Sequence, residues 1–260
     1  MKSLPFVPSG AFPAVIVPLT DAAVPALVDH AVQAVTAPGV HALEWRVDTL
    51  QYFLDADHTL DTHEIEPVRA AITEAVDSFR DRVPGGFPVL VTIRTVGEGG
   101  HADLTDAAYA HLIDHIVNRG PVAVDIEWQR ADSKALIGRA KDAGVVPLAS
   151  FHDFEKTPPA EYLYSMLQKM ERDGAETAKI AVMPNTRTDV LEVLSVADRA
   201  QAKMTVPVIT ISMGDLGKAT RLVGSEFGSA ATWAAVGELS APGQLTADEV
   251  RGTLEALGRA

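Results

Sequence analysis

The chain of 260 residues is 47% hydrophobic and 22% charged, a balance typical of a globular protein with a large buried core. Its formal net charge of −13 argues against a nucleic-acid partner, because such a surface repels phosphate groups. It contains no cysteine, which excludes disulfides, thiolate nucleophiles and zinc held by cysteine.

Short apolar runs recur along the chain and alternate with amphipathic segments. The runs are 12–19, 41–48, 89–95, 122–128, 145–151, 178–184, 206–213 and 230–236, and helical spacing is clear in 64–82, 105–118, 160–173 and 189–203. Buried strands that alternate with helices predict parallel βα units. Eight such units in this length predict a (β/α)8 TIM barrel, an α/β fold, as a single domain over residues 1–260. A doubly wound sheet is the alternative, but no glycine-rich dinucleotide turn follows the first run.

Boundary signals between the runs agree with this reading. Thr105 can cap the helix that it opens, and Gly120, Gly144 and Gly174 each follow a helical segment where a C-cap glycine is typical. The acidic and irregular segment 50–62 is predicted to be a surface loop.

The second run carries a charge at every second position, with Glu44, Arg46 and Asp48. A period of two places these side chains on one face of a strand. Inside a barrel, such a face forms either a salt-bridge ladder or a ridge that binds substrate, and both possibilities stay open.

Polar residues also end the third and fourth runs. Arg94 can hold an anion or a pair of hydroxyls. The glycines of 97–100 let a loop approach a ligand closely, although a plain loop explains them as well. Asp125 and Glu127 could ligate a metal, but we favour a structural role facing the arginines.

His152 and Lys179 lie on neighbouring strands of the predicted barrel. His152 directly follows the fifth run and is a natural acid or base at physiological pH. Lys179 lies inside the sixth run, where desolvation lowers the pKa of the amine and favours Schiff-base chemistry on a ketone or aldehyde. Alternatively, Lys179 extends to water or pairs with a buried carboxylate.

The last units add further polar groups. Met213 ends the seventh run and Arg221 follows in the next helix. Segment 237–244, after the eighth run, contains flexible glycines, a stiff proline and the polar Ser240 and Gln244. We predict that it is a lid or a loop that contacts ligand.

These residues together resemble the type I 3-dehydroquinate dehydratases, the Schiff-base enzymes of the shikimate pathway. The resemblance covers most of the chain in six ordered blocks: 43–48, Arg94 with 98–100, 150–154 with 157–158, 179–184, 213–214 with Gly217 and Arg221, and 240–244. Each block is weak alone, but six in order at the ends of predicted strands make a strong signal. The chain departs at Pro18, where the family often has Ser, and at Thr220, where Ser is common.

The resemblance implies a hydro-lyase that converts 3-dehydroquinate to 3-dehydroshikimate by syn elimination of water, with no metal and no cofactor. In this reading Lys179 forms the imine with the substrate ketone. His152 removes the proton next to that carbon and then protonates the departing hydroxyl, while Glu98 orients and tunes His152.

The resemblance also implies how the substrate is held. One group of side chains binds the ring hydroxyls, Met213 packs against the ring, and another group holds the carboxylate and closes the site. The hydroxyl group comprises Glu44, Arg46 and Arg94, and the carboxylate group comprises Arg221, Ser240 and Gln244.

Residues 1–10 lack the apolar core of a signal peptide, and no apolar stretch is long enough to cross a membrane. We therefore expect a cytoplasmic protein with no membrane partner, and the resemblance suggests a homodimer. Two other functions stay open: a class I aldolase-like enzyme that uses Lys179 on another carbonyl substrate, and a barrel without activity that binds a metabolite or partner.

Overall fold

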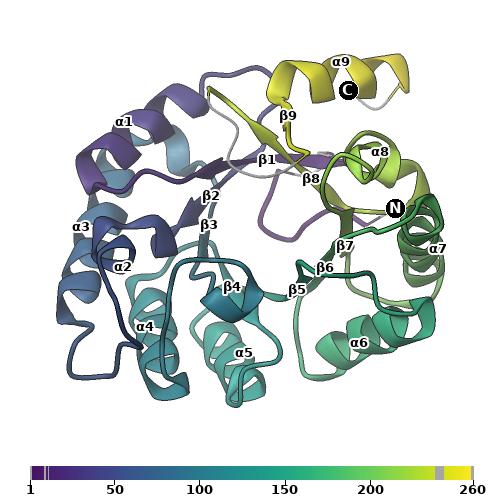
Figure 1. Cartoon of the computed structure of the whole chain (residues 1–260). Coiled ribbons are helices and arrows are strands. Elements are labelled where there is room, and N and C mark those ends of the chain that lie inside the picture. Colours follow the sequence, from purple (N-terminus) through teal and green to yellow (C-terminus); the bar gives the residue numbers. More distant parts are fainter. Residues whose placement is uncertain (1, 9, 11, 238–242, 259–260) are drawn as a thin grey trace.

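The computed structural model describes residues 2–8, 10, 12–237 and 243–258. Within them, parallel strands stand at the centre and helices surround them (Figure 1). The barrel strands are β1 Ala14–Leu19, β2 Ala42–Arg46, β3 Val89–Thr92, β4 Ala123–Glu127, β5 Val146–Asp153, β6 Thr177–Val182, β7 Val208–Ser212 and β8 Ala231–Ala235. The (β/α)8 prediction is confirmed.

The sheet curls almost fully round on itself. Strands β1 to β7 pair in chain order, and β1 also pairs with β8. Between β7 and β8 the link is an isolated bridge from Val208 to Ser229 and a hydrogen bond of 2.8 Å from the Ala230 N–H to the Val208 carbonyl. The short β9 (Leu245–Thr246) lies beside β8. All the barrel strands therefore end around one mouth.

The main helices cover the outside of the barrel (Figure 1). They are α1 Val24–Ala34, α3 Glu66–Arg82, α4 Asp106–Arg119, α5 Ser133–Asp142, α6 Ala160–Arg172, α7 Arg187–Lys203, α8 Lys218–Val223 and α9 Ala247–Ala256. In α3 the buried Val68, Ile72 and Phe79 recur at helical spacing, which explains why this face packs on the sheet. None of the described helices is long and apolar enough to cross a membrane.

The predicted caps are present, but segment 50–62 differs from the prediction. The Thr105 hydroxyl accepts a hydrogen bond from the Ala108 N–H, and Gly120 ends α4 with φ of 71°. Segment 50–62 contains the one-turn helix α2 (Gln51–Leu54) instead of only loop. The reason is packing, because Phe53 and Leu60 are buried in the core. Along the sequence they are flanked by charged residues, so the segment looked like a polar loop.

An apolar floor fills the amino end of the barrel. Inward side chains such as Ile16 and Leu148 form a cluster with Leu4 and Phe6, which come from the segment before β1. The Lys2 ammonium donates a hydrogen bond of 2.7 Å to a carbonyl near the end of α7, and this holds the segment at the strand starts. The polar residues are left to the carboxyl end.

Candidate active site

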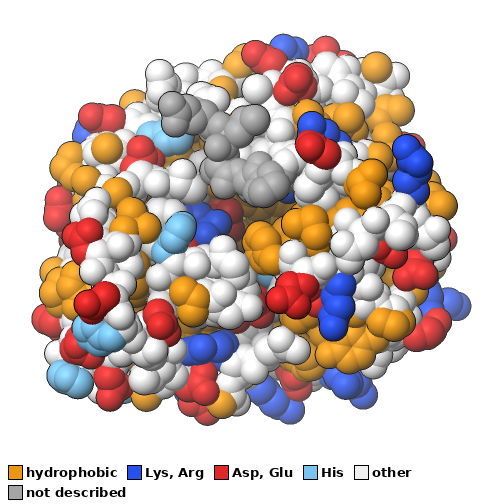
Figure 2. Space-filling model, viewed as in Figure 1, with side chains coloured by type: hydrophobic (Ala, Val, Ile, Leu, Met, Phe, Trp, Pro, Cys, Tyr) orange, Lys and Arg blue, Asp and Glu red, His pale blue; other side chains and the backbone are white. Residues whose placement is uncertain are grey.

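A cavity opens at the carboxyl ends of the strands, with an empty volume of about 620 Å³ that is partly open to solvent. Figure 2 shows a hollow near the centre of this face, with basic and hydrophobic side chains around it. All the predicted site residues except Ser240 line the cavity: Glu44, Arg46, Arg94, Glu98, His152, Lys179, Met213, Arg221 and Gln244. Ser240 lies outside the described residues.

Strand alternation points Lys179 into the cavity. Its neighbours Ala178 and Ile180 belong to the core between sheet and helices, so the side chain of Lys179 must face the interior. Lys179 is only 5% exposed, and its Nζ lies 3.9 Å from Asp125 Oδ2 and 4.2 Å from the ring centroid of Trp233. The lysine therefore does not extend to water.

The surroundings of Lys179 favour a free amine. Burial lowers its pKa from the ordinary lysine value, and the positive charges of Arg94 and Arg46 add to this effect. Glu44 and Asp125 act in the opposite direction without cancelling it. A larger fraction of this amine is therefore unprotonated than in a solvated lysine.

His152 and Glu98 form a buried pair. His152 Nδ1 lies 2.8 Å from Glu98 Oε2, and the His152 backbone N–H donates to the same oxygen at 3.0 Å. Burial lowers the pKa of His152 well below 6.5, helped by Arg94 and Lys179, and burial raises the pKa of Glu98. The imidazole is thus neutral at pH 7, and in the tautomer that donates its Nδ1–H to Glu98 the Nε2 atom is the one that can act as a base.

Arg94 connects three carboxylates, two from β4 and one from the loop after β3. Its guanidinium lies 3.3 Å from Glu98, 2.8 Å from Asp125 and 3.1 Å from Glu127. The Ser150 hydroxyl accepts from Arg94 and donates to Asp125 at 2.6 Å. Asp125 and Glu127 therefore face an arginine, as we predicted for them. This network fixes the carboxylate beside His152 and the one nearest Lys179.

The alternating charges Glu44, Arg46 and Asp48 serve both purposes considered for them, although β2 ends at Arg46 and Asp48 lies in the short 3₁₀ helix that follows. Arg46 donates two hydrogen bonds of 2.7 Å to Asp48, which is an ion pair of the ladder type. Glu44 and Arg46 also line the cavity. The Glu44 carboxylate accepts hydrogen bonds from the Thr92 hydroxyl at 2.9 Å and from the Trp233 indole at 2.8 Å.

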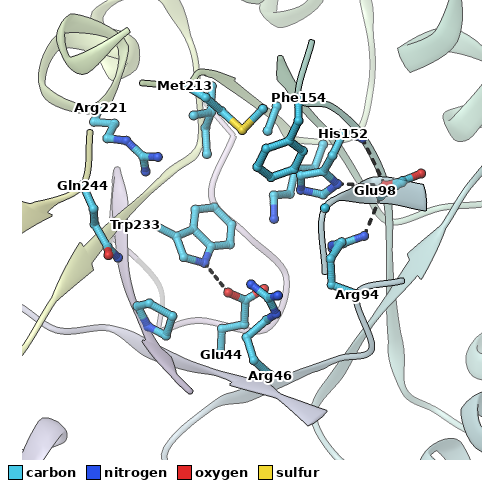
Figure 3. Close-up of a pocket in the computed structure, with 15 residues that line it drawn as sticks. Glu44, Arg46, Arg94, Glu98, His152, Phe154, Met213, Arg221, Trp233 and Gln244 are labelled. Carbon is cyan, nitrogen blue, oxygen red and sulfur yellow. Dashed lines mark hydrogen bonds and ion pairs between the residues drawn. The ribbon is translucent and has the colours of Figure 1, made fainter. Parts of the chain in front are cut away.

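Arg221 is a buried cation. Among the described residues, no carboxylate forms an ion pair with it, and its Nε has no hydrogen-bond partner. Burial lowers its pKa to about 10. Arg221 and Gln244 lie on one side of the cavity, across from His152 and Glu98 (Figure 3). That side suits a ligand with a negative charge.

Sequence reasoning missed several lining residues, above all Trp233, Phe154 and Ile211. The period of two that we applied to Glu44 and Arg46 could have found Trp233 and Ile211, since both belong to the inward-facing cluster. Phe154 follows His152 by two residues, and its ring occupies the space that a side chain at Gly99 would need. Periodicity gives only the direction in which an apolar side chain of a strand points, and nothing in the sequence marks such a residue as a ligand contact.

Comparisons with known proteins agree on one family. A sequence model of the family described as "Type I 3-dehydroquinase" matches residues 15–260. The 3-dehydroquinate dehydratase of Shouchella clausii is 34% identical over 251 residues, covering 95% of this chain and 92% of that protein. The crystal structure of 3-dehydroquinate dehydratase from Geobacillus kaustophilus superposes with a TM-score of 0.86 at 30% identity, covering 99% and 98% of the two chains. A type I 3-dehydroquinate dehydratase from Clostridium difficile, whose crystal structure contains covalently modified comenic acid, gives a TM-score of 0.82 at 31% identity, covering 95% and 92% of the two chains.

Proposed function

The chain belongs to the type I 3-dehydroquinase family and is a 3-dehydroquinate dehydratase, and we propose that Lys179 and His152 carry out its reaction. One observation supports this most strongly. A buried amine with a lowered pKa and a neutral imidazole held by Glu98 face the same cavity from neighbouring strands. The first can add to a ketone and the second can move a proton.

In the first step, the Lys179 amine adds to the substrate ketone, and loss of water with uptake of one proton gives a protonated imine. This cation accepts an electron pair readily, so the proton on the neighbouring carbon becomes easier to remove. His152 Nε2 takes that proton, and the electron pair moves towards the imine nitrogen to form an enamine. Neither a metal nor an organic cofactor is required, because the imine itself is the electron sink.

In the second step, the enamine expels the hydroxyl one carbon further on. That hydroxyl takes the proton from His152 and leaves as water, so the imidazole returns to its neutral form. Another water then hydrolyses the protonated imine, releasing 3-dehydroshikimate, the free Lys179 amine and the proton taken up in the first step. Glu98 keeps the imidazole oriented throughout, which supports its predicted role.

The cavity walls support the predicted binding roles. Arg221, which has no acid beside it among the described residues, and Gln244 line one side of the cavity, which supports their predicted binding of the substrate carboxylate. Met213 lines the cavity too and can pack on the ring. Glu44 and Arg46 offer polar atoms to the ring hydroxyls. Arg94 belongs to this group by prediction, and its three carboxylate partners support a positioning role as well: Glu98, Asp125 and Glu127.

We further propose that the chain forms a homodimer, which the family resemblance supports, and that it works in the cytoplasm. Its described helices offer no membrane span. The partner that the family assigns is a small molecule, 3-dehydroquinate.

Adding 3-dehydroquinate to the purified chain should raise the enone absorbance of 3-dehydroshikimate. Borohydride present during turnover should reduce the imine and leave a stable adduct on the peptide that contains Lys179, which mass spectrometry would identify. An aldolase-like enzyme would give no absorbance change with this substrate. Ligand binding with no adduct under any condition would favour a barrel without activity.

Arg221→Lys should raise KM by about 10- to 100-fold with little change in kcat, because the ammonium keeps the charge but loses the paired N–H donors of the guanidinium. Initial rates over a range of substrate concentrations would measure this. Arg187→Lys, at an exposed position at the start of α7, is the matched control and should behave as the native chain. A lower kcat at unchanged KM would assign Arg221 to the chemical step instead.

A further inference from the structure

Trp233 of β8 contacts two polar groups of the cavity at once. Its ring centroid lies 4.2 Å from Lys179 Nζ, and its indole N–H donates to Glu44 Oε2 at 2.8 Å. Figure 3 shows the N–H of Trp233 directed at Glu44. Around the barrel, β8 is separated by β7 from β6, which carries the lysine, and by β1 from β2, which carries the glutamate. The Trp233 side chain reaches across the interior to both residues.

The ring face of Trp233 favours the cationic forms of the Lys179 nitrogen. An indole face attracts a cation more strongly than other aromatic rings, and the attraction grows when water is excluded. Both the ammonium and the protonated imine carry that positive charge. The charged groups facing the nitrogen are Asp125 and Glu44, which favour the cation, and Arg94, Arg46 and any protonated His152, which oppose it.

The indole N–H has a separate effect on Glu44. The carboxylate accepts one hydrogen bond on each oxygen, from Thr92 and from Trp233, so it cannot rotate without breaking a buried contact. Phenylalanine would keep a ring face but lose the N–H donor. The two effects of Trp233 can therefore be separated by substitution.

We propose that Trp233 is a positioning residue of the dehydration, with its indole face holding the cationic nitrogen of Lys179 and its N–H holding Glu44 towards the substrate. This proposal rests on the proposed function, in which Lys179 forms the imine. Glu44, which accepts the hydrogen bond from the Trp233 indole, is also predicted to bind the ring hydroxyls of the substrate. Trp233 therefore acts on the reaction through two other side chains, Lys179 at its ring face and Glu44 at its N–H.

The first test needs no substrate. Trace acetic anhydride labels free amines, so the extent of labelling at Lys179 against pH, read by peptide mass spectrometry, gives the pKa of this amine. Trp233→Leu keeps the site apolar but removes the ring face, and should move the labelling curve about one pH unit lower. Trp233→Phe should stay closer to the native curve.

The second test separates the two contacts by kinetics. Trp233→Phe should raise KM about five- to tenfold with kcat within about threefold of native, because only the hydrogen bond to Glu44 is lost. Trp233→Leu should lower kcat by a further factor of about ten, because the protonated imine loses its ring face. Trp128→Phe is the matched control, since the Trp128 indole also donates to a carboxylate, at 3.0 Å to Asp173, away from the cavity lining.

These experiments test the role of Trp233 separately from the proposed imine mechanism on which it rests. A labelling curve in Trp233→Leu identical to native overturns the role of the ring, and an unchanged KM in Trp233→Phe overturns the role of the N–H. A native chain that forms no borohydride adduct overturns the imine route, while the labelling curves still decide the contact with Lys179. If circular dichroism shows that Trp233→Leu is unfolded, Trp233→Met, which fills more of the space, replaces it.

Discussion

Lys179→Ala is expected to lower kcat/KM by about 10⁴-fold or more and to abolish the adduct that borohydride traps, because the covalent route is deleted. The loss should greatly exceed that from any single substrate-binding arginine. Among the described residues that line the cavity there is no second lysine to replace it, and the arginines there do not form imines at neutral pH. Enone absorbance and peptide mass spectrometry would measure both effects.

Controls for this result come from the same chain. Lys156→Ala, at an exposed lysine just after β5, should keep native turnover. Lys179→Met keeps most of the buried volume, so its thermal unfolding would show whether the loss of activity reflects chemistry or a collapsed cavity. Turnover by a well-folded Lys179→Met at more than about a hundredth of the native rate would contradict the imine mechanism.

His152→Ala is expected to form the imine but to eliminate water about 10²- to 10⁴-fold more slowly, since proton transfer loses its base and acid. The adduct should therefore build up, and borohydride should trap more of the chain at a given time than in the native enzyme. Rapid mixing followed by mass spectrometry would measure both the imine and its decay. Full turnover in His152→Ala would contradict the assignment.

The pH dependence provides a second readout for His152. Burial lowers the pKa of this imidazole well below 6.5, so its base form persists as the pH falls through the range where a solvated histidine becomes charged. The acid limb of kcat should accordingly lie below pH 6.5 and disappear in His152→Ala. His111→Ala, at an exposed helical position, should leave the profile unchanged. An acid limb that persists in His152→Ala belongs to another group.

The barrel and most of its polar lining could be predicted because strands and helices leave periodic signals. A charge inside an apolar run, as at Lys179, stands out, and the ends of parallel strands must meet. The partners of those charges could not be predicted. Trp233 and Glu44 are 189 positions apart, and only the closure of the barrel brings them together. The set of carboxylates around Arg94 likewise depends on strand register, which periodicity does not give.

The helix α2 and the position of Phe154 show the other limit. Short turns are determined by which apolar side chains find a buried place, as Phe53 does, and not by a repeating pattern. Phe154 is 42% exposed yet lines the cavity, so neither its hydropathy nor its exposure would have marked it. Its place follows from the close approach to Gly99.

The apolar floor made with Leu4 and Phe6 governs the exchange of molecules as well as stability. With the amino end filled, substrate, product and the water expelled in each cycle share the mouth at the carboxyl end. A new 3-dehydroquinate enters only after 3-dehydroshikimate has left. If Arg221 holds the substrate carboxylate, as proposed above, the product carries the same group and competes directly with the substrate. Flux through the enzyme therefore depends on how quickly the next reaction removes the product.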